Sequence, residues 1–225
     1  MGAQNYMRDQ LVFKFPFKKK YYEQDFYVSS NNFSAFKLIE NWPNWPGKWL
    51  NIFGEHGSGK THLSKVLEKK IKKIRIIDVN KINNKTIDDL RLFDCLIIDN
   101  FKDHLNEKLF YSILHQSKQI DNYIVINTIK PLKKFSFKLN DLQSRINSFV
   151  FIGIDLPTDD LLEVIISKSF SDMQINISPK VSSYIIKNID RSYEKMFKFI
   201  QDIDELSLSS GKSININLIK KVLNQ

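Results

Sequence analysis

The stretch Gly54-Glu55-His56-Gly57-Ser58-Gly59-Lys60-Thr61 decides how the rest of the chain is interpreted. It matches the phosphate-loop pattern G-x-x-x-x-G-K-[ST], in which the lysine reaches the β- and γ-phosphates and the hydroxyl holds Mg²⁺. Glycines let successive backbone N–H groups curve around an anion without a side chain in the way. The candidate nucleotide-binding residues here are Gly54, Gly57, Ser58, Gly59, Lys60, Thr61 and His62.

The residues on either side of the loop strengthen this interpretation. Residues 49–53 are typical of a short buried strand, and residues 61–68 of a helix leaving the loop with its positive end toward the phosphates. A glycine-rich turn without function is the alternative. At an average glycine usage of about 7%, this pattern should arise by chance in well under about 1% of chains of this length.

Bulk composition restricts the class of protein. A chain of 225 residues can build one good core, or a core and a small satellite domain. Its 42% hydrophobic and 26% charged residues are typical of soluble globular proteins, and no apolar run approaches the ~20 residues of a membrane span. Cys95, the single cysteine, excludes an internal disulfide and is expected to be a buried thiol. We expect no membrane association and a cytoplasmic location.

The formal net charge of +9 has two explanations. It could mark nucleic-acid binding, or it could reflect an AT-rich genome, since 29 of the 34 basic residues are lysine. The lysines are mostly scattered, whereas a binding footprint should cluster on one face. We therefore expect direct DNA binding to be weak or absent. Where lysine is the default cation, the five arginines stand out, because only arginine has the guanidinium fork.

The order of predicted elements indicates an α/β fold. Five apolar runs are typical of buried parallel strands: residues 49–53, 74–78, 94–100, 123–128 and 149–154. Helical patterns separate them, which predicts a parallel five-stranded sheet flanked by helices. Ser29 to Asn32 supply N-cap chemistry for a helix containing Phe33 and Ile39. After Pro157 only helical patterns follow, over about 70 residues.

Ligands of such sheets gather at the carboxyl ends of the strands, where the loop, Asp99 and Asn127 all fall. Asp99 is a candidate Mg²⁺-orienting acid, with a simple turn cap as the alternative. An ATPase usually has a second carboxylate next to it, but here the position is Asn100, which cannot accept a proton. Intrinsic hydrolysis should therefore be weak. Asn127 could contact the γ-phosphate or act only as a cap.

Two further features have open alternatives. Arg145 lies in a short helical piece, residues 140–145; it could stabilise phosphoryl-transfer charge in a neighbouring molecule, or form a surface salt bridge. Near the N-terminus, apolar residues alternate before a proline, so an extended peptide could pack on its own domain or dock in a partner's groove. That segment consists of Gln10, Leu11, Phe13, Phe15 and Pro16, with intervening Val12 and Lys14.

This order of motifs resembles the AAA+ module of the bacterial replication initiator DnaA. The likeness covers roughly residues 22–225 and includes Leu142-x-Ser144-Arg145 and the helical lid. It implies three regions: a tail at 1–21, an AAA+ nucleotide-binding core at 22–156, and a helical lid at 157–225. Residues 26–32 are similar to the adenine-holding segment, which implies nucleotide contacts from Phe26, Val28 and Asn32. The lid's sensor arginine aligns with Glu194, and Arg191 one turn earlier is the candidate substitute.

The tail is similar to the clamp-binding peptide of Hda, the regulatory inactivator homologous to DnaA. The chain also ends after the lid, so the initiator's C-terminal DNA-binding domain is expected to be missing. The resemblance implies an adaptor that binds ADP or ATP with Mg²⁺ through Thr61 and Asp99. On the DNA-loaded sliding clamp it would present Arg145 to ATP on DnaA, preventing re-initiation. A homodimer is left open. The rival hypotheses are a helicase-loader-like ATPase acting on nucleic acid and a catalytically silent scaffold on the clamp.

Overall fold

The computed structural model describes residues 26–102, 105–211 and 213–223. The described residues form two compact units, which divide between Thr158 and Asp159. The candidate clamp-binding residues lie outside the described ranges; they are Gln10, Leu11, Phe13, Phe15 and Pro16.

The first unit is built on a five-stranded sheet in which every pairing is parallel, which confirms the predicted fold class. The strands are β1 (Trp49–Phe53), β2 (Ile74–Asp78), β3 (Cys95–Asp99), β4 (Tyr123–Thr128) and β5 (Val150–Gly153). Their order is β2-β3-β4-β1-β5, so the strand that leads into the phosphate loop has neighbours on both sides. All residues of β3 and nearly all of β4 are buried, as continuous apolar runs predict.

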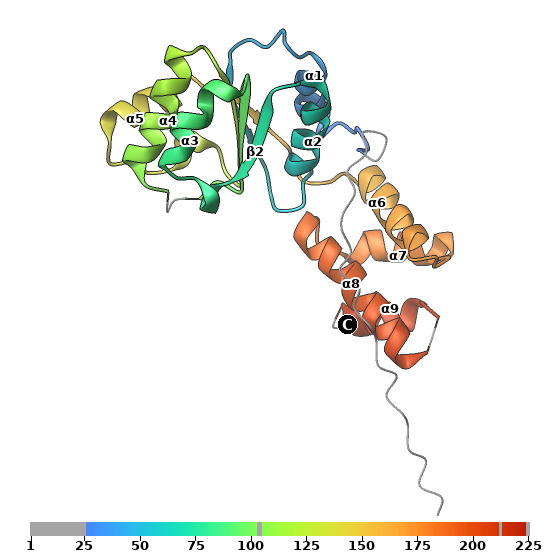
Figure 1. Cartoon of the computed structure of the whole chain (residues 1–225). Coiled ribbons are helices and arrows are strands. Elements are labelled where there is room, and N and C mark those ends of the chain that lie inside the picture. Colours follow the sequence, from blue (N-terminus) through green and yellow to red (C-terminus); the bar gives the residue numbers. More distant parts are fainter. Residues whose placement is uncertain (1–25, 103–104, 212, 224–225) are drawn as a thin grey trace, which may run out of the picture. The chain divides into compact units, whose positions relative to one another are not determined.

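Helices cover both faces of this sheet (Figure 1). They are α1 (Phe33–Glu40), α2 (Lys60–Lys70), α3 (Asn84–Asp89), α4 (Glu107–Gln119) and α5 (Asn140–Ile146), with short 3₁₀ turns η2 (Val79–Lys81), η3 (Leu90–Leu92) and η4 (Leu132–Lys134). Alternate residues of a strand point to opposite faces of the sheet and therefore pack in different cores. Ile97 packs with residues of α1 and α2, whereas Ile98 packs with residues of α4 and α5. Cys95 is buried in the former core, as predicted, and burial raises the pKa of its thiol to about 12.

The cap predicted for α1 is wrong in its chemistry. Asn32 does occupy the N-cap position, but its side chain makes no capping hydrogen bond. Its Oδ1 accepts from the Ser29 backbone N–H at 3.0 Å, and its Nδ2 donates to the Tyr27 carbonyl at 2.9 Å. Asn32 therefore folds the preceding segment back on itself instead of capping the helix.

The second unit is all-helical and has its own core. It comprises α6 (Asp159–Asp172), α7 (Pro179–Asn188), α8 (Tyr193–Ser210) and α9 (Ile216–Val222). Ser178 caps α7, with Pro179 at its first position, and Gly211 in the left-handed conformation ends α8. Within the described ranges, no helix has the length and apolar content needed to cross a membrane.

Candidate nucleotide site and Arg145 surface

The phosphate loop joins the end of β1 to the start of α2, and three of its residues must be glycine. Gly59 has φ +98°, and a Cβ there would lie 2.8 Å from the ring of Phe26. A Cβ on Gly54 would lie 2.7 Å from the Ile154 carbonyl oxygen. Gly57, with φ +81°, supplies a further left-handed residue. The loop is therefore shaped by backbone conformation and close packing, which leaves its N–H groups free of side-chain obstruction.

Lys60 begins α2 and reaches back over the loop. Its Nζ donates to the carbonyl oxygens of Gly54 at 2.8 Å and Glu55 at 2.7 Å, and lies 3.4 Å from the hydroxyl of Ser58. Burial lowers the pKa of this ammonium to about 8, although the carboxylates of Asp99 and Glu55 act in the opposite direction. An anion placed in the loop would relieve the burial penalty on the charged form.

Three of the predicted site residues meet at the carboxyl ends of β3 and β4. The Thr61 hydroxyl donates to Asp99 Oδ2 at 2.8 Å, and Asn127 Nδ2 donates to Asp99 Oδ1 at 3.0 Å. Asn127 Nδ2 also lies 2.8 Å from the hydroxyl of Ser64, one turn along α2 from Lys60. Sequence reasoning missed Ser64, whose position four residues after the lysine was the available signal.

The donor set of this network fits a Mg²⁺–nucleotide. Mg²⁺ prefers oxygen ligands and usually takes them from one or two protein groups, water and substrate phosphates. The Thr61 hydroxyl and the Asp99 carboxylate supply such oxygens at hydrogen-bonding separation. The buried Asn127 Oδ1 has no hydrogen-bond partner among the residues that the structure describes, so it remains an acceptor that a bound water can satisfy.

Asn100 follows Asp99, and its side chain is engaged by Asp78. It has φ +56°, and its Nδ2 donates to Asp78 Oδ2 at 2.8 Å. Hydrogen bonds from Asn100 and Asn80 hold the pKa of the Asp78 carboxyl below its usual value. The Asn100 amide cannot act as a base. Its hydrogen bond also stabilises the charged form of Asp78, so Asp78 accepts a proton less readily.

An aromatic cluster borders the loop where the resemblance implied adenine contacts. The ring of Phe26 stacks on Phe36, with centroids 5.7 Å apart, and meets His62 edge-on at 5.2 Å. Val28 is half-buried on the same segment, and Asn32 holds that segment through Tyr27. Phe36 cannot be recognised as a site residue from the sequence, because its position equally fits the apolar face of α1.

Arg145 lies near the end of α5, a few residues before β5 begins. Its Nη2 lies 2.6 Å from His115 Nδ1 and donates to the Tyr111 hydroxyl at 3.3 Å, and the guanidinium carbon lies 4.8 Å from the Tyr111 ring centroid. The alternative of a surface salt bridge finds no support in the described part of the chain, where arginine forms ion pairs at Arg75–Asp89 and Arg191–Asp159 but not at Arg145.

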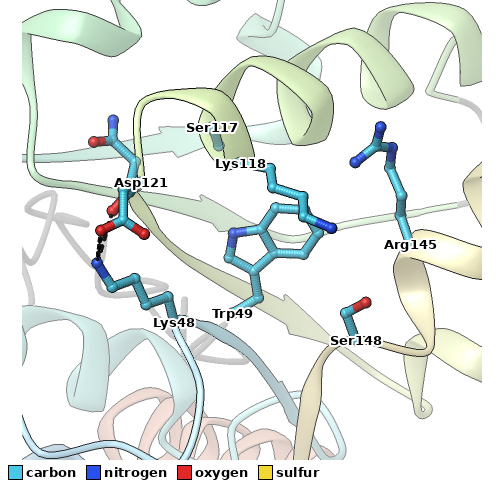
Figure 2. Close-up of a pocket in the computed structure, with 8 residues that line it drawn as sticks. Lys48, Trp49, Ser117, Lys118, Asp121, Arg145 and Ser148 are labelled. Atoms are coloured by element: carbon cyan, nitrogen blue, oxygen red, sulfur yellow. Dashed lines mark hydrogen bonds and ion pairs between the residues drawn. The ribbon is translucent and has the colours of Figure 1, made fainter.

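Arg145 also borders a pocket of about 310 Å³ at the amino ends of β1, β4 and β5. In Figure 2, Trp49 lies at the centre of the view, the Lys118 side chain crosses its indole in projection, and Lys48 is paired with Asp121. The lining residues are Lys48, Trp49, Ser117, Lys118, Asp121, Asn122, Arg145 and Ser148. The Ser117 hydroxyl is buried and lacks a hydrogen-bond partner within the described ranges. This hollow is lined by three basic side chains and one acid.

The candidate sensor residue lies in the helical unit. Arg191 precedes α8 and pairs with Asp159 Oδ1 at 2.8 Å, and both side chains are more than half exposed. Glu194 stands in the first turn of α8, where a negative charge interacts favourably with the helix dipole. Both residues therefore have local structural roles in the unit that contains them.

Comparison with known proteins shows what these features are similar to. A family profile described as "Hda, lid domain" matches residues 160–223. The initiator DnaA of Buchnera aphidicola (Baizongia pistaciae) is 29% identical over 96% of this chain and 53% of its own length. An uncharacterised Haemophilus influenzae protein is 20% identical over 89% of this chain and 92% of its own length. The chain thus spans about half the length of the initiators it matches.

Solved structures agree on the fold. Domain III of Thermotoga maritima DnaA superposes with a TM-score of 0.74 and 18% identity, over 93% of this chain and 98% of that domain. AMPPCP-bound DnaA from Aquifex aeolicus gives 0.67 at 19% identity, over 86% of this chain and 66% of its own. One chain thus combines a phosphate loop and a parallel sheet with the fold of DnaA domain III, and a helical unit that matches the Hda lid-domain profile.

Proposed function

We propose that the chain is a nucleotide-bound regulatory adaptor that stimulates ATP hydrolysis by the replication initiator DnaA. Its own nucleotide, ADP or ATP, would be held by the loop N–H groups and Lys60, with Mg²⁺ at Thr61 and Asp99 and the adenine near Phe26. Structures of DnaA with AMPPCP support nucleotide binding by this fold. When bound, Mg²⁺ would neutralise phosphate charge.

Weak hydrolysis by the chain itself is part of the proposal. General-base chemistry needs a group that can accept a proton from the attacking water. Asn100 cannot, and it occupies Asp78 through a 2.8 Å hydrogen bond. The bound nucleotide would then act mainly as a structural element joining the loop, α2 and the ends of β3 and β4.

The position of Arg145 is the observation that carries the proposal. The phosphate loop follows the carboxyl end of β1, whereas Arg145 borders a pocket at the amino ends of β1, β4 and β5. Five strand residues at about 3.3 Å each put roughly 16 Å of sheet between these edges. Arg145 is therefore poorly placed for the chain's own nucleotide and well placed for one on a neighbouring molecule.

The charge of Arg145 supports the same role. The structure shows no ion pair for it within the described ranges; its contacts are an imidazole, a phenol and an aromatic face. Its positive charge is therefore available to a partner's phosphates, where an arginine supplied by another molecule is worth roughly 10³–10⁵ in rate. DnaA is the proposed target because the chain is homologous to it and AAA+ modules of one family can pair with each other.

The tail completes the proposal. Gln10 would enter a polar subsite of the sliding clamp, and Leu11, Phe13 and Phe15 its apolar groove, followed by Pro16. Binding to the DNA-loaded clamp would bring Arg145 to DnaA in the cytoplasm after replication has begun, and so prevent re-initiation. A clamp pull-down tests this part: Gln10→Ala with Leu11→Ala should abolish capture. Undiminished capture would refute the tail assignment.

The proposed activity is tested by following ADP formation on ATP-loaded DnaA in the presence of DNA-loaded clamp. The wild-type chain should accelerate it, and Arg145→Ala should remove the acceleration. Arg91→Ala is the matched control, because it removes the same group from an exposed position in η3. Strong stimulation by Arg145→Ala would refute the proposal. A steep salt dependence of binding to free DNA, without stimulation, would instead favour a nucleic-acid motor.

A further inference from the structure

Two residues of α4 hold the guanidinium of Arg145. His115 Nδ1 is 2.6 Å from Arg145 Nη2, and the Tyr111 hydroxyl is 3.3 Å from the same nitrogen. The two rings stack on each other, with centroids 5.8 Å apart and planes at 15°. They are four residues apart on one helix and so share a face, which makes a preformed seat for a side chain from α5.

The contact fixes the location of the imidazole proton. Arginine can only donate, so His115 Nδ1 must accept through a lone pair, and the ring proton must lie on Nε2. The side-chain nitrogen of Gln119 lies 3.1 Å from Nε2, and two donors cannot share a hydrogen bond. The oxygen and nitrogen of an amide are nearly indistinguishable by shape, and only the oxygen can accept from Nε2–H. With the Gln119 amide turned over so that its oxygen accepts from Nε2–H, the contacts form a directed chain from Arg145 through His115 to Gln119.

This seat orients the guanidinium without cancelling its charge. Both hydrogens of Nη2 are used by neutral acceptors, while Nε–H and the two hydrogens of Nη1 make no hydrogen bond within the described ranges. A carboxylate in the same place, as beside Arg75 or Arg191, would hold the side chain equally well but would neutralise it. A positioned and still cationic fork is what phosphate recognition needs.

We propose that His115, as its neutral Nε2–H tautomer, is a positioning residue for Arg145, with Tyr111 as the second contact. The inference rests on the proposed function, in which Arg145 enters a partner's nucleotide site. The role of His115 is measured by the maximal rate of DnaA-bound ATP hydrolysis. A misdirected guanidinium still allows the two proteins to bind, but it stabilises the developing phosphate charge less well. His115 touches no substrate and acts only through Arg145.

The tautomer can be tested without any partner. The ¹⁵N NMR signals of the His115 imidazole are assigned by their loss in His115→Asn. The chemical shift of Nδ1 should be that of an unprotonated nitrogen that accepts a hydrogen bond, and the shift of Nε2 that of a protonated nitrogen. Arg145→Ala should move the Nδ1 signal toward that of a free imidazole nitrogen. A proton on Nδ1, or a His115 spectrum unchanged by Arg145→Ala, would overturn the proposal.

Two variants of His115 distinguish the effect of its hydrogen-bond acceptor from the effect of its aromatic ring. His115→Phe keeps a stacking ring and loses the acceptor, so the maximal rate of DnaA-bound ATP hydrolysis should fall roughly 10- to 100-fold with the half-saturating concentration unchanged. In His115→Asn the amide oxygen takes the place of Nδ1, so the rate should recover to well above that of His115→Phe. Equal rates for the two variants would refute an acceptor role.

The outcomes distinguish the two proposals. If Arg145→Ala stimulates DnaA like the wild-type chain, the proposed function fails, whatever the NMR spectra show. If Arg145→Ala is inactive but His115→Phe keeps the wild-type maximal rate, the proposed function stands and the role of His115 is refuted. Folding of His115→Phe is checked by its circular dichroism melting curve.

Discussion

Lys60 is the residue whose ionisation should report nucleotide binding most directly. Burial lowers the pKa of its ammonium to about 8, and bound phosphates favour the charged form, so binding raises this pKa and takes up a proton above about pH 8. Affinity for ADP should be flat well below pH 8 and fall above it, approaching tenfold per pH unit. Titration calorimetry between pH 6.5 and 9.5 measures this. Lys60→Arg stays charged and should lose the slope; an identical slope in that variant would show that another group titrates.

Asn100 tests why the chain should be a weak hydrolase. Asn100→Asp restores a second carboxylate but places it against Asp78, and two carboxylates at this distance resist joint ionisation. The single variant should therefore gain little ATPase activity. Asn100→Asp with Asp78→Asn replaces the repulsion by a hydrogen bond and should raise turnover by roughly 10²-fold through general-base catalysis. A phosphate-release assay compares the two; a single variant as active as the double one would contradict this reasoning.

Among the elements, β1 is tied to its surroundings by a buried polar side chain. Asn51 Nδ2 donates to the Ile126 carbonyl and the Thr128 hydroxyl, and its Oδ1 accepts from the Leu132 N–H at 2.7 Å. Asn51→Leu leaves these buried groups unpaired, at a cost of about 1–3 kcal/mol for each group that water cannot reach. Urea unfolding should show a large fall in the free energy of unfolding. A change within about 0.5 kcal/mol, the range of a surface substitution, would contradict this role.

The helices and strands could be predicted because apolar periodicity and the residues that begin or end an element are local signals. The apolar run before Asp99 became a fully buried strand, and Ser178-Pro179 began a helix. Strand order was not predictable from the pattern, since it depends on which crossover packs best. The cap at Asn32 failed because its side chain found a closer partner in the segment before it. The contact between Arg145 and His115 could not be predicted from the sequence, because His115 lies 30 residues away on another helix.

The two units of the chain have separate buried cores. Ile203 is fully buried in the core of α6 to α9, and none of that core's residues belongs to the cores on either side of the sheet. Ile203→Ala should cost about 2–5 kcal/mol, and the loss should be confined to the helical unit. Hydrogen exchange should show faster amides in α6 to α9 and unchanged protection in β3 and β4. Equal acceleration in both units would show a single cooperative unit.

Hydrolysis on DnaA can be separated from hydrolysis by the chain itself in a single-turnover measurement. DnaA is loaded with labelled ATP, free nucleotide is removed, and the chain is added with DNA-loaded clamp, so that label converted to ADP reports hydrolysis on DnaA alone. We predict fast conversion with the wild-type chain and Arg91→Ala, and a rate lower by about 10³-fold or more with Arg145→Ala. Equal rates for Arg145→Ala and the wild-type chain would show that Arg145 does not stimulate hydrolysis on DnaA.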